Sequence, residues 1–234
     1  MSPKKNYYIT TPIYYVNDKP HTGHAYTTIA CDALARFKKL DGYSVKFLTG
    51  TDEHGQKVAK AAQDKGITPQ DFTDKVSESF RDLTKTLSIT NDDFIRTTEN
   101  RHLKACQFFW DSISNNNAPD GKPWITLDKY AGWYSLRDEA YHTEDELTTN
   151  NNGEKIAPNG NKVEWVEEDS YFFRLSATQD ILLKFYKENP NFIGPKSRKN
   201  EVISFVKSGL KDISISRTSF NWGIPVPENQ KHVM

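Results

Sequence analysis

The residues of this sequence that could do chemistry gather in two short segments. The first runs from Tyr8 to His24 and reads as a short strand, a proline-containing loop and the beginning of a helix. His21 and His24 lie three residues apart at this helix start, so both imidazoles share one face and can donate hydrogen bonds. Gly23, between them, has no Cβ to hinder the approach of a flat base or a ribose. Because the N–H groups and the positive dipole end of a helix start also favour phosphate, the segment indicates a nucleotide site.

The same histidines also have simpler explanations. His21 could meet only solvent, His24 could be an ordinary, partly buried histidine, and a four-residue pattern recurs by chance. The second segment, TGTDEHG at Thr49–Gly55, follows another predicted strand, and composition alone favours a charged turn there. The context favours a site, because parallel sheets bind ligands beyond the carboxyl ends of their strands, where both segments lie.

Strands and helices alternate over the first half of the chain, which predicts an α/β fold with a doubly wound parallel sheet. The predicted strands are residues 6–13, 45–48 and 94–97, and the predicted helices are residues 23–40, 55–65, 69–87 and 99–113. The turn-rich segment SNNNAPDGKP at 114–123 marks a boundary. Beyond it the pattern changes to short strands such as 124–127, an Asn/Gly-rich loop at 148–162, and helices near 176–188 and 197–208.

Composition limits the partners that the chain can attract. Its 234 residues allow one large or two small domains. The 31 basic and 31 acidic side chains give no net charge, so any RNA contact needs a local patch. One candidate patch sets seven basic residues against Glu188 and Glu201, although a solvated helix face explains it slightly better. The seven are Lys184, Lys187, Lys196, Arg198, Lys199, Lys207 and Lys211.

The cysteines and the chain start indicate a compartment. Cys31 and Cys106 are single, widely spaced thiols, which indicates a reducing environment rather than a disulfide framework or a metal knuckle. The first residues, MSPKKNYY, lack the apolar stretch of a signal peptide, and no run approaches membrane-spanning length. The sequence therefore predicts a cytoplasmic protein with no membrane partner.

Longer stretches resemble the N-terminal part of the bacterial-type methionyl-tRNA synthetases, a family of class I aminoacyl-tRNA synthetases. HTGH at 21–24 is similar to the class signature HIGH, with Thr22 in its variable second position. The resemblance covers nearly the whole chain, through residues 10–24, 25–37, 47–62, 130–147, 167–176, 197–217 and 221–227.

The resemblance implies a Rossmann-like parallel sheet, incomplete in this chain, that is interrupted by a connective α+β insertion. The implied parts are the first half of the catalytic domain (1–115), the insertion (116–213) and the return to the catalytic domain (214–234). In the family the later strands, the KMSKS loop and an anticodon-binding domain follow. We therefore expect a fragment that is inactive by itself.

The implied reaction joins L-methionine to ATP as methionyl-adenylate, releases pyrophosphate, and then transfers methionine to tRNA(Met). The resemblance makes both histidines catalytic and assigns ATP binding to His21, Thr22, Gly23 and His24. It places Asp52 on the methionine ammonium and assigns the rest of the methionine site to Ile13, Tyr15, His54 and Gly55. Without the resemblance, Ile13 and Tyr15 would be interpreted as core residues. Arg217 matches an arginine near the active site, and a surface ion pair is its alternative.

Metal binding is predicted to differ from that of many relatives, which carry cysteine knuckles in the insertion. Here Ser135 and Asp138 occupy the two cysteine places. Serine is not a ligand of structural zinc and His142 alone cannot replace it, so we expect no zinc. Mg²⁺ is expected with ATP, because phosphate-bound Mg²⁺ takes most of its ligands from water and substrate. We also expect a monomer.

Two alternatives remain open. Another class I synthetase or a smaller nucleotidyltransferase could share the HxGH loop. The aromatic stretch PIYYVN at 12–17 and the short insertion argue against the large editing enzymes, and the missing cysteines argue against a cysteinyl enzyme. The other alternative is a truncated, catalytically inactive fragment that binds tRNA or protein.

Overall fold

The computed structural model describes residues 5–135, 137–138, 140–150 and 152–234. Its described residues form two compact units. The first unit extends to Cys106 and also includes Trp222–Ile224, and the second consists of Gln107–Asn221 and Pro225–Met234. The predicted boundaries at 115/116 and 213/214 stay a prediction. Each unit is described by itself.

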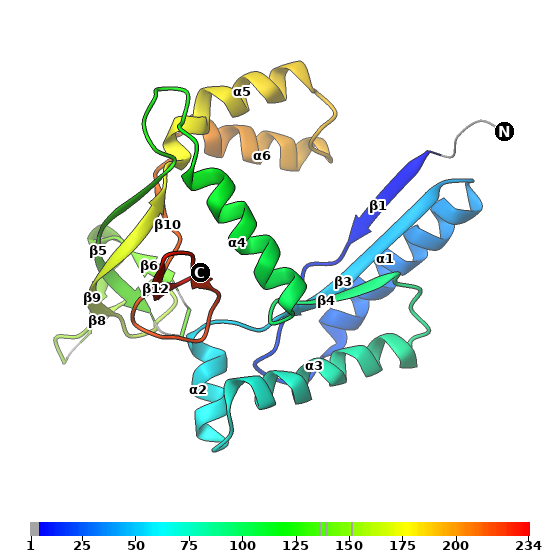
Figure 1. The fold of residues 1–234 in the computed structure, drawn as a ribbon, viewed down its shortest axis with the longest axis horizontal. Helices are drawn as coiled ribbons and strands as arrows, with labels where there is room; N and C mark the ends of the chain where they lie inside the picture. The colour runs from blue at the N-terminus through cyan, green and yellow to red at the C-terminus, as the bar shows by residue number, and fades with distance from the viewer. Residues whose placement is uncertain (1–4, 136, 139, 151) are drawn as a thin grey trace. The chain divides into compact units, whose positions relative to one another are not determined.

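The first unit is built on a parallel sheet with β3 at its centre (Figure 1). Its strands are β1 (Asn6–Thr10), β2 (Tyr14–Tyr15), β3 (Ser44–Asp52) and β4 (Asp93–Arg96). Leu48 of β3 pairs with Thr10 of β1 and with Asp93 of β4, so these two strands flank β3 on opposite sides. β2 pairs with β3 on the same side as β1, but nearer the carboxyl end of β3. The parallel α/β fold predicted from the sequence is confirmed, as an incomplete Rossmann-like sheet.

One predicted strand is divided in two. Residues 6–13 were expected to form one strand, but β1 ends at Thr10 and pairing resumes only at Tyr14. Pro12 lies in the gap, and proline has no N–H to give to a sheet ladder. Thr11 still donates its N–H to the Leu48 carbonyl at 3.1 Å, so the chain stays beside β3 until the interruption.

The helices of the first unit begin and end within one residue of the predicted bounds. They are α1 (Thr22–Leu40), α2 (Gln56–Asp64), α3 (Pro69–Thr86) and α4 (Asn100–Ser114), whose second half belongs to the second unit. Helix α1 packs along β1 and β3. Helices α2 and α3 pack together, and α3 begins at a Thr68 cap, whose hydroxyl accepts the Asp71 N–H at 3.1 Å.

The core of the first unit lies among β2, β4 and the two packed helices. Burial of its apolar side chains provides the main driving force for this arrangement. The cluster consists of Tyr14, Val16, Val58, Ala62, Phe72, Phe80 and Phe94, with Tyr15, Ala61, Ile67, Val76 and Trp222 packed against it.

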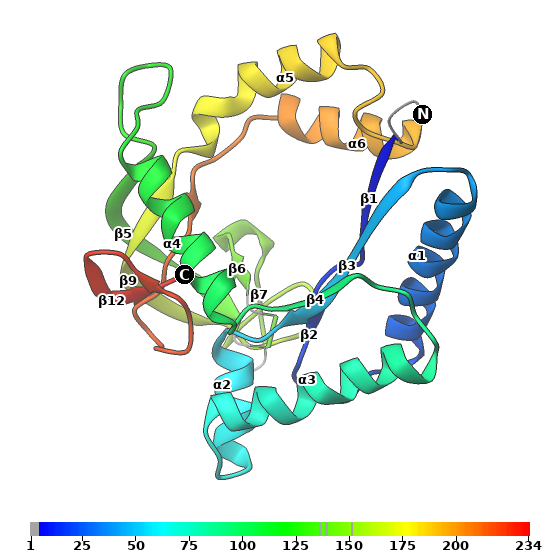
Figure 2. The ribbon, with the colours of Figure 1, turned by 45° about the vertical axis from the view of Figure 1, so that its right-hand side comes forward.

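The second unit contains an antiparallel sheet in the order β10–β9–β5–β6 and a pair of helices that lie side by side in Figure 2. The strands are β5 (Ile125–Ser135), β6 (Ala140–His142), β9 (Glu164–Phe173) and β10 (Ile213–Ser214). Two short hairpins pair β7 (Thr148–Thr149) with β8 (Lys155–Ile156), and β11 (Pro225–Val226) with β12 (Asn229–Val233). The helices are α5 (Gln179–Glu188) and α6 (Lys196–Lys207), and single 3₁₀ turns lie at Glu144–Glu146 and Leu175–Thr178. Strands and helices are thus segregated here, as an α+β region requires.

Across the described ranges, no helix has both the length and the apolar character that crossing a membrane requires.

Candidate active site in the first unit

The predicted histidine pair is fixed at the beginning of α1 by hydrogen bonds in both directions. His21 is the N-cap residue, and its Nδ1 accepts the Gly23 N–H at 3.1 Å. His24 lies three residues further on, and its Nδ1 accepts the His21 N–H at 3.1 Å. The two rings stack with their centroids 3.8 Å apart. The histidines therefore satisfy helix-start donors that would otherwise lack partners.

These bonds decide which nitrogens remain for a ligand. In a neutral imidazole one nitrogen donates and the other accepts. Since both Nδ1 atoms accept, His21 and His24 each carry the proton on Nε2 when neutral. The helix start thus offers two Nε2–H donors beside its own N–H groups, which is suitable chemistry for phosphate oxygens.

His24 is held among aromatic side chains. Its ring centroid lies 4.8 Å from that of Tyr14 and 5.1 Å from that of Phe80. Thr28 donates its hydroxyl to the His24 carbonyl at 2.8 Å, and the Tyr14 hydroxyl bonds to the Thr28 hydroxyl at 2.7 Å. Burial, and then the charge of His21, lower the pKa of His24. His24 is therefore a neutral donor at neutral pH, with a fixed ring.

The missing Cβ of Gly23 leaves room for the His21 ring, a contact that the sequence did not reveal. We expected its missing Cβ to leave room for a base or ribose. In the structure, a Cβ at this position would lie 2.9 Å from Cε1 of His21. The glycine therefore lets the His21 ring fold back over the helix start. Thr22, the first residue of α1, is exposed.

Strand β2 joins the histidine pair to the end of β3. Its Tyr14, which contacts His24, pairs with Thr51, and Tyr15 pairs with Asp52, the last residue of β3. Tyr15 is partly buried, and the Lys57 ammonium lies 5.9 Å from its ring centre. Ile13, which precedes β2, is 42% exposed. The structure thus brings the predicted residues Tyr15 and Asp52 together on neighbouring strands.

The next predicted residues, His54 and Gly55, follow β3 and contact Trp222. The His54 and Trp222 rings lie 5.3 Å apart, and burial lowers the pKa of His54 to about 4. Gly55 has a φ of +107°, which favours glycine, and it donates its N–H to the Trp222 carbonyl at 3.1 Å. Nothing in the local sequence pattern indicated that Trp222 lies beside this segment.

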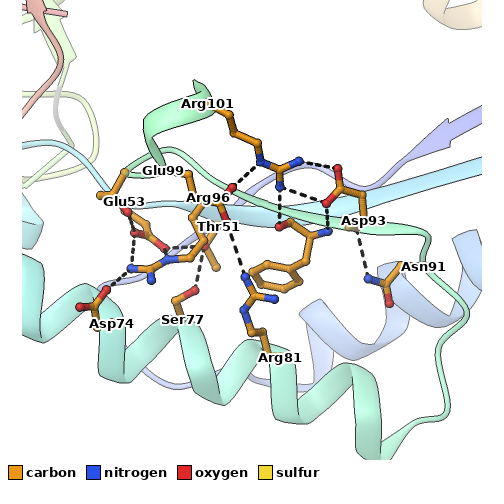
Figure 3. A network of polar contacts seen from close by, with 12 residues as sticks. Thr51, Glu53, Asp74, Ser77, Arg81, Asn91, Asp93, Arg96, Glu99 and Arg101 are labelled. Atoms are coloured by element: carbon orange, nitrogen blue, oxygen red, sulfur yellow. Dashed lines mark hydrogen bonds and ion pairs between the residues drawn. The ribbon is translucent and has the colours of Figure 1, made fainter. Parts of the chain in front are cut away.

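Glu53, between Asp52 and His54, is a second residue that sequence reasoning missed. Its side chain is fully buried and receives two hydrogen bonds from Arg96, at 2.7 and 2.8 Å (Figure 3). Thr51 donates to the same carboxylate at 2.6 Å and Thr98 at 2.5 Å. Arg96 also reaches Asp74 of α3 at 2.5 Å. The sequence offered only the opposite charges of Glu53 and Arg96 as a signal, because neither the extension of β3 to Asp52 nor its pairing with β4 was predicted.

Arg217 lies in the second unit. Its Nε is 3.7 Å from a Glu168 carboxylate oxygen, and its guanidinium lies 5.5 Å from the ring centre of Tyr141 and 6.0 Å from that of Tyr130. It also donates to the Ser216 carbonyl at 2.7 Å. Its predicted place beside the active site stays a prediction.

The predicted zinc-knuckle places are joined by hydrogen bonds. Ser135 donates its hydroxyl to one Asp138 carboxylate oxygen at 2.5 Å, and the Asn161 amide donates to the other at 2.6 Å. Glu139 and Leu136 of the same predicted segment lie outside the described residues. Within the part of the chain that the structure describes, no three His, Cys, Asp or Glu side chains are arranged to hold a metal ion.

A helix start that offers N–H donors beside the carboxyl ends of parallel strands is the arrangement at which α/β domains commonly bind nucleotides. Comparison with known proteins narrows the class. The family model described as "tRNA synthetases class I (M)" matches residues 7–234, and the chain belongs to this family.

Individual relatives match nearly the whole chain. The methionine–tRNA ligase of Rickettsia typhi is 61% identical over 231 residues, and that of Mesorhizobium japonicum is 56% identical over 231 residues. Each match covers 99% of this chain and 44% of the relative. The crystal structure of Mycobacterium tuberculosis methionyl-tRNA synthetase bound by methionyl-adenylate is 50% identical, with a TM-score of 0.89. That match covers 98% of this chain and 44% of the other, so the chain spans less than half the length of these relatives.

Proposed function

We propose that this chain carries the site at which ATP activates L-methionine to methionyl-adenylate, for transfer to tRNA(Met). The observation that carries the proposal is the histidine pair at the beginning of α1, whose Nδ1 atoms both accept helix N–H groups and whose Nε2 atoms are left to donate. The identity to methionine–tRNA ligases over nearly the whole chain supports the choice of amino acid.

In the proposed first step, a methionine carboxylate oxygen forms a bond to the α-phosphorus of ATP. The bond between that phosphorus and the bridging oxygen to the β-phosphate breaks, and pyrophosphate leaves with the electron pair. The nucleophile is already an anion, so the step needs no general base. Catalysis then rests on positioning and on stabilising the charge that develops on the phosphate oxygens. The Nε2–H groups of His21 and His24 and the N–H group of Thr22 supply donors for that charge, and Gly23, whose N–H is bound by His21, would lie against the phosphates.

The methionine would lie at the end of β3. A zwitterionic substrate needs an anion for its ammonium group, and we assign this role to Asp52, the last residue of the strand. Tyr15, its neighbour on β2, would provide an aromatic wall for the thioether, a contact that contributes up to about 1.5 kcal/mol. Ile13, His54 and Gly55 would border the same pocket, and Arg217 would support the site from the chain that follows the insertion.

The remaining partners belong to the same proposal. Mg²⁺ would enter with ATP rather than bind to a protein cage, and we propose no zinc. We further propose that the protein acts as a monomer in the cytoplasm, where charged tRNA is used. A local patch on α5 and α6 is the candidate for RNA contact, because the chain has no net charge.

The test is methionine-dependent exchange of pyrophosphate with ATP, measured on the natural gene product that contains residues 1–234. Replacing His24 with Ala removes one donor to the transition state, so the exchange rate should fall by about 10²- to 10³-fold, with a smaller change in methionine affinity. Lys39→Ala, an exposed position in the last turn of the same helix, is the matched control and should keep the parental rate. A parental rate in the His24 variant would remove this histidine from catalysis.

A further inference from the structure

Trp222 is placed differently from the chain around it. Trp222–Ile224 belong to the first unit, whereas Asn221 and Pro225 on either side belong to the second. The Trp222 indole N–H donates to the Glu53 carbonyl at 2.6 Å, and the Trp222 carbonyl accepts the Gly55 N–H at 3.1 Å. Its ring also contacts His54, at 5.3 Å between centroids. One residue thus holds all three residues of the segment 53–55, from a point 167 residues further along the chain.

The other side of this segment is held by side-chain bonds. The buried Glu53 carboxylate accepts from Arg96 and Thr51 (Figure 3). It also accepts from Thr98, and the Glu53 N–H bonds to the Thr97 hydroxyl at 2.9 Å. These bonds fix where Glu53 lies. They do not reach the Glu53 carbonyl or the Gly55 N–H, which Trp222 binds. Trp222 therefore completes the attachment of the connection between β3 and α2.

We propose that Trp222 is a positioning residue for the methionine site. It acts by fixing the segment 53–55 directly after Asp52, the residue that we assign to the substrate ammonium. This proposal rests on the proposed function. The physical reason is that the charge-assisted hydrogen bond between a carboxylate and an ammonium is strong only at short donor–acceptor distances, so a displaced Asp52 would bind methionine less tightly.

The role of Trp222 can be separated from that of the ATP site. The histidine pair is fixed by its own hydrogen bonds at the beginning of α1, in which Trp222 takes no part. Loss of the indole N–H should therefore affect methionine before it affects ATP. An interaction that binds ground state and transition state alike changes KM more than kcat.

The test uses Trp222→Phe, which keeps an aromatic ring against His54 and removes the indole donor. Trp165→Phe, at a 56% exposed position on β9 in the second unit, is the control. The natural gene product is examined by amide hydrogen exchange and by pyrophosphate exchange with methionine or ATP varied.

We expect exchange of the amides at 51–56 to be faster by about tenfold, and the KM for methionine to rise by about tenfold, which matches the loss of one hydrogen bond. The KM for ATP, kcat and the control should change less than twofold.

Three outcomes would overturn the proposal. Parental hydrogen exchange at 51–56 would show that Trp222 does not hold the segment. Faster exchange with an unchanged KM for methionine, or an equal rise in both KM values, would show that the segment does not position methionine.

A parent without methionine-dependent activity would refute the proposed function instead, and methionine binding by calorimetry together with amide exchange would then decide the role of Trp222. If Trp222→Phe does not fold, Trp222→Tyr provides the same comparison.

Discussion

At the residue scale, the choice of histidine as a helix cap has a chemical consequence. Asp, Asn, Ser and Thr are the usual N-cap residues. An Asp at position 21 would place a negative charge where a phosphate is to bind. His21 accepts a helix N–H through Nδ1 and leaves Nε2 as a donor, so one side chain both caps the helix and favours an anion. His24 repeats the arrangement in the opposite direction along the chain.

This dual role predicts a separation of stability from activity. His21→Asp keeps a good N-cap, so the free energy of unfolding should change by less than about 1 kcal/mol. The new carboxylate should repel the phosphates and lower methionine-dependent pyrophosphate exchange by about 10²-fold or more. His21→Asn, which caps without a charge, is the matched control and should lose less activity. Equal losses in the two variants would mean that the charge at this position does not matter.

His54 should make the stability of the first unit depend on pH. Burial lowers its pKa to about 4 in the folded protein, from 6.5 in the unfolded chain. Between these values the unfolded state binds the extra proton, so the free energy of unfolding should fall as the pH falls from 6.5 towards 4. The loss should approach about 3 kcal/mol.

Urea unfolding of the parent and of His54→Phe across this pH range measures the effect. The phenylalanine keeps a ring against Trp222 and cannot titrate. The parent should therefore lose more stability than the variant on acidification, while the two should show similar slopes above pH 6.5. Parallel pH profiles throughout would show that His54 is not buried in its neutral form.

The sequence predicted where single residues of the candidate site lie better than it predicted what holds them there. His21, His24 and Asp52 stand at ends of elements, where position along the chain determines their place. Their partners come from distant segments: Phe80 beside His24, and Trp222 beside His54. No local pattern encodes such contacts, because they exist only after the chain has folded.

At the scale of elements, the close approach of β3 and β4 depends on Gly50. It pairs with Ile95 in the parallel ladder, and a Cβ at Gly50 would lie 2.0 Å from the Ile95 carbonyl oxygen. This obstacle is backbone, which cannot move without breaking the ladder. A single glycine within a strand pattern is a signal for close backbone approach, so the sequence TGTD contained this information. The break at Pro12 also had a signal in the sequence, because proline cannot donate an N–H to a strand ladder. The prediction of one continuous strand over 6–13 did not take this into account.

Gly50→Ala should therefore be strongly destabilising for a one-carbon change. We expect the free energy of unfolding to fall by about 3 kcal/mol, at the upper end of what overpacking usually causes. Ser44→Ala, at the exposed first residue of the same strand, is the control and should change it by less than about 0.5 kcal/mol. Chemical denaturation measures both. A Gly50 variant as stable as the control would mean that β3 and β4 can separate at this point at little cost.

At the scale of the whole molecule, both compact units combine buried apolar side chains with polar bonds between segments that are distant in sequence. The first buries apolar side chains between a parallel sheet and helices, and adds the buried Glu53–Arg96 pair. In the second, polar cross-links join segments that are distant in sequence, such as Asp138 with Asn161. The α/β fold class could be predicted from the sequence, because strands and helices alternate in the first unit. The β5–β9 pairing of the second unit could not be predicted with its register, because its strands are separated by a long, turn-rich segment.

The cross-link at Asp138 predicts that the whole protein folds without zinc. Both carboxylate oxygens already accept hydrogen bonds, from Ser135 and from Asn161, and the Ser135 bond is the main reason why the pKa of Asp138 is lowered. Metal analysis should find well under one zinc per chain, and dialysis against a chelator should leave the melting temperature unchanged. Asp138→Ala should lower the free energy of unfolding, because it leaves the partly buried donors of Ser135 and Asn161 without their acceptor. The exposed Asp169→Ala on β9 should have little effect. Zinc that survives dialysis at one per chain, or a melting temperature that falls with the chelator, would mean that a metal and not this hydrogen-bonded carboxylate orders the region.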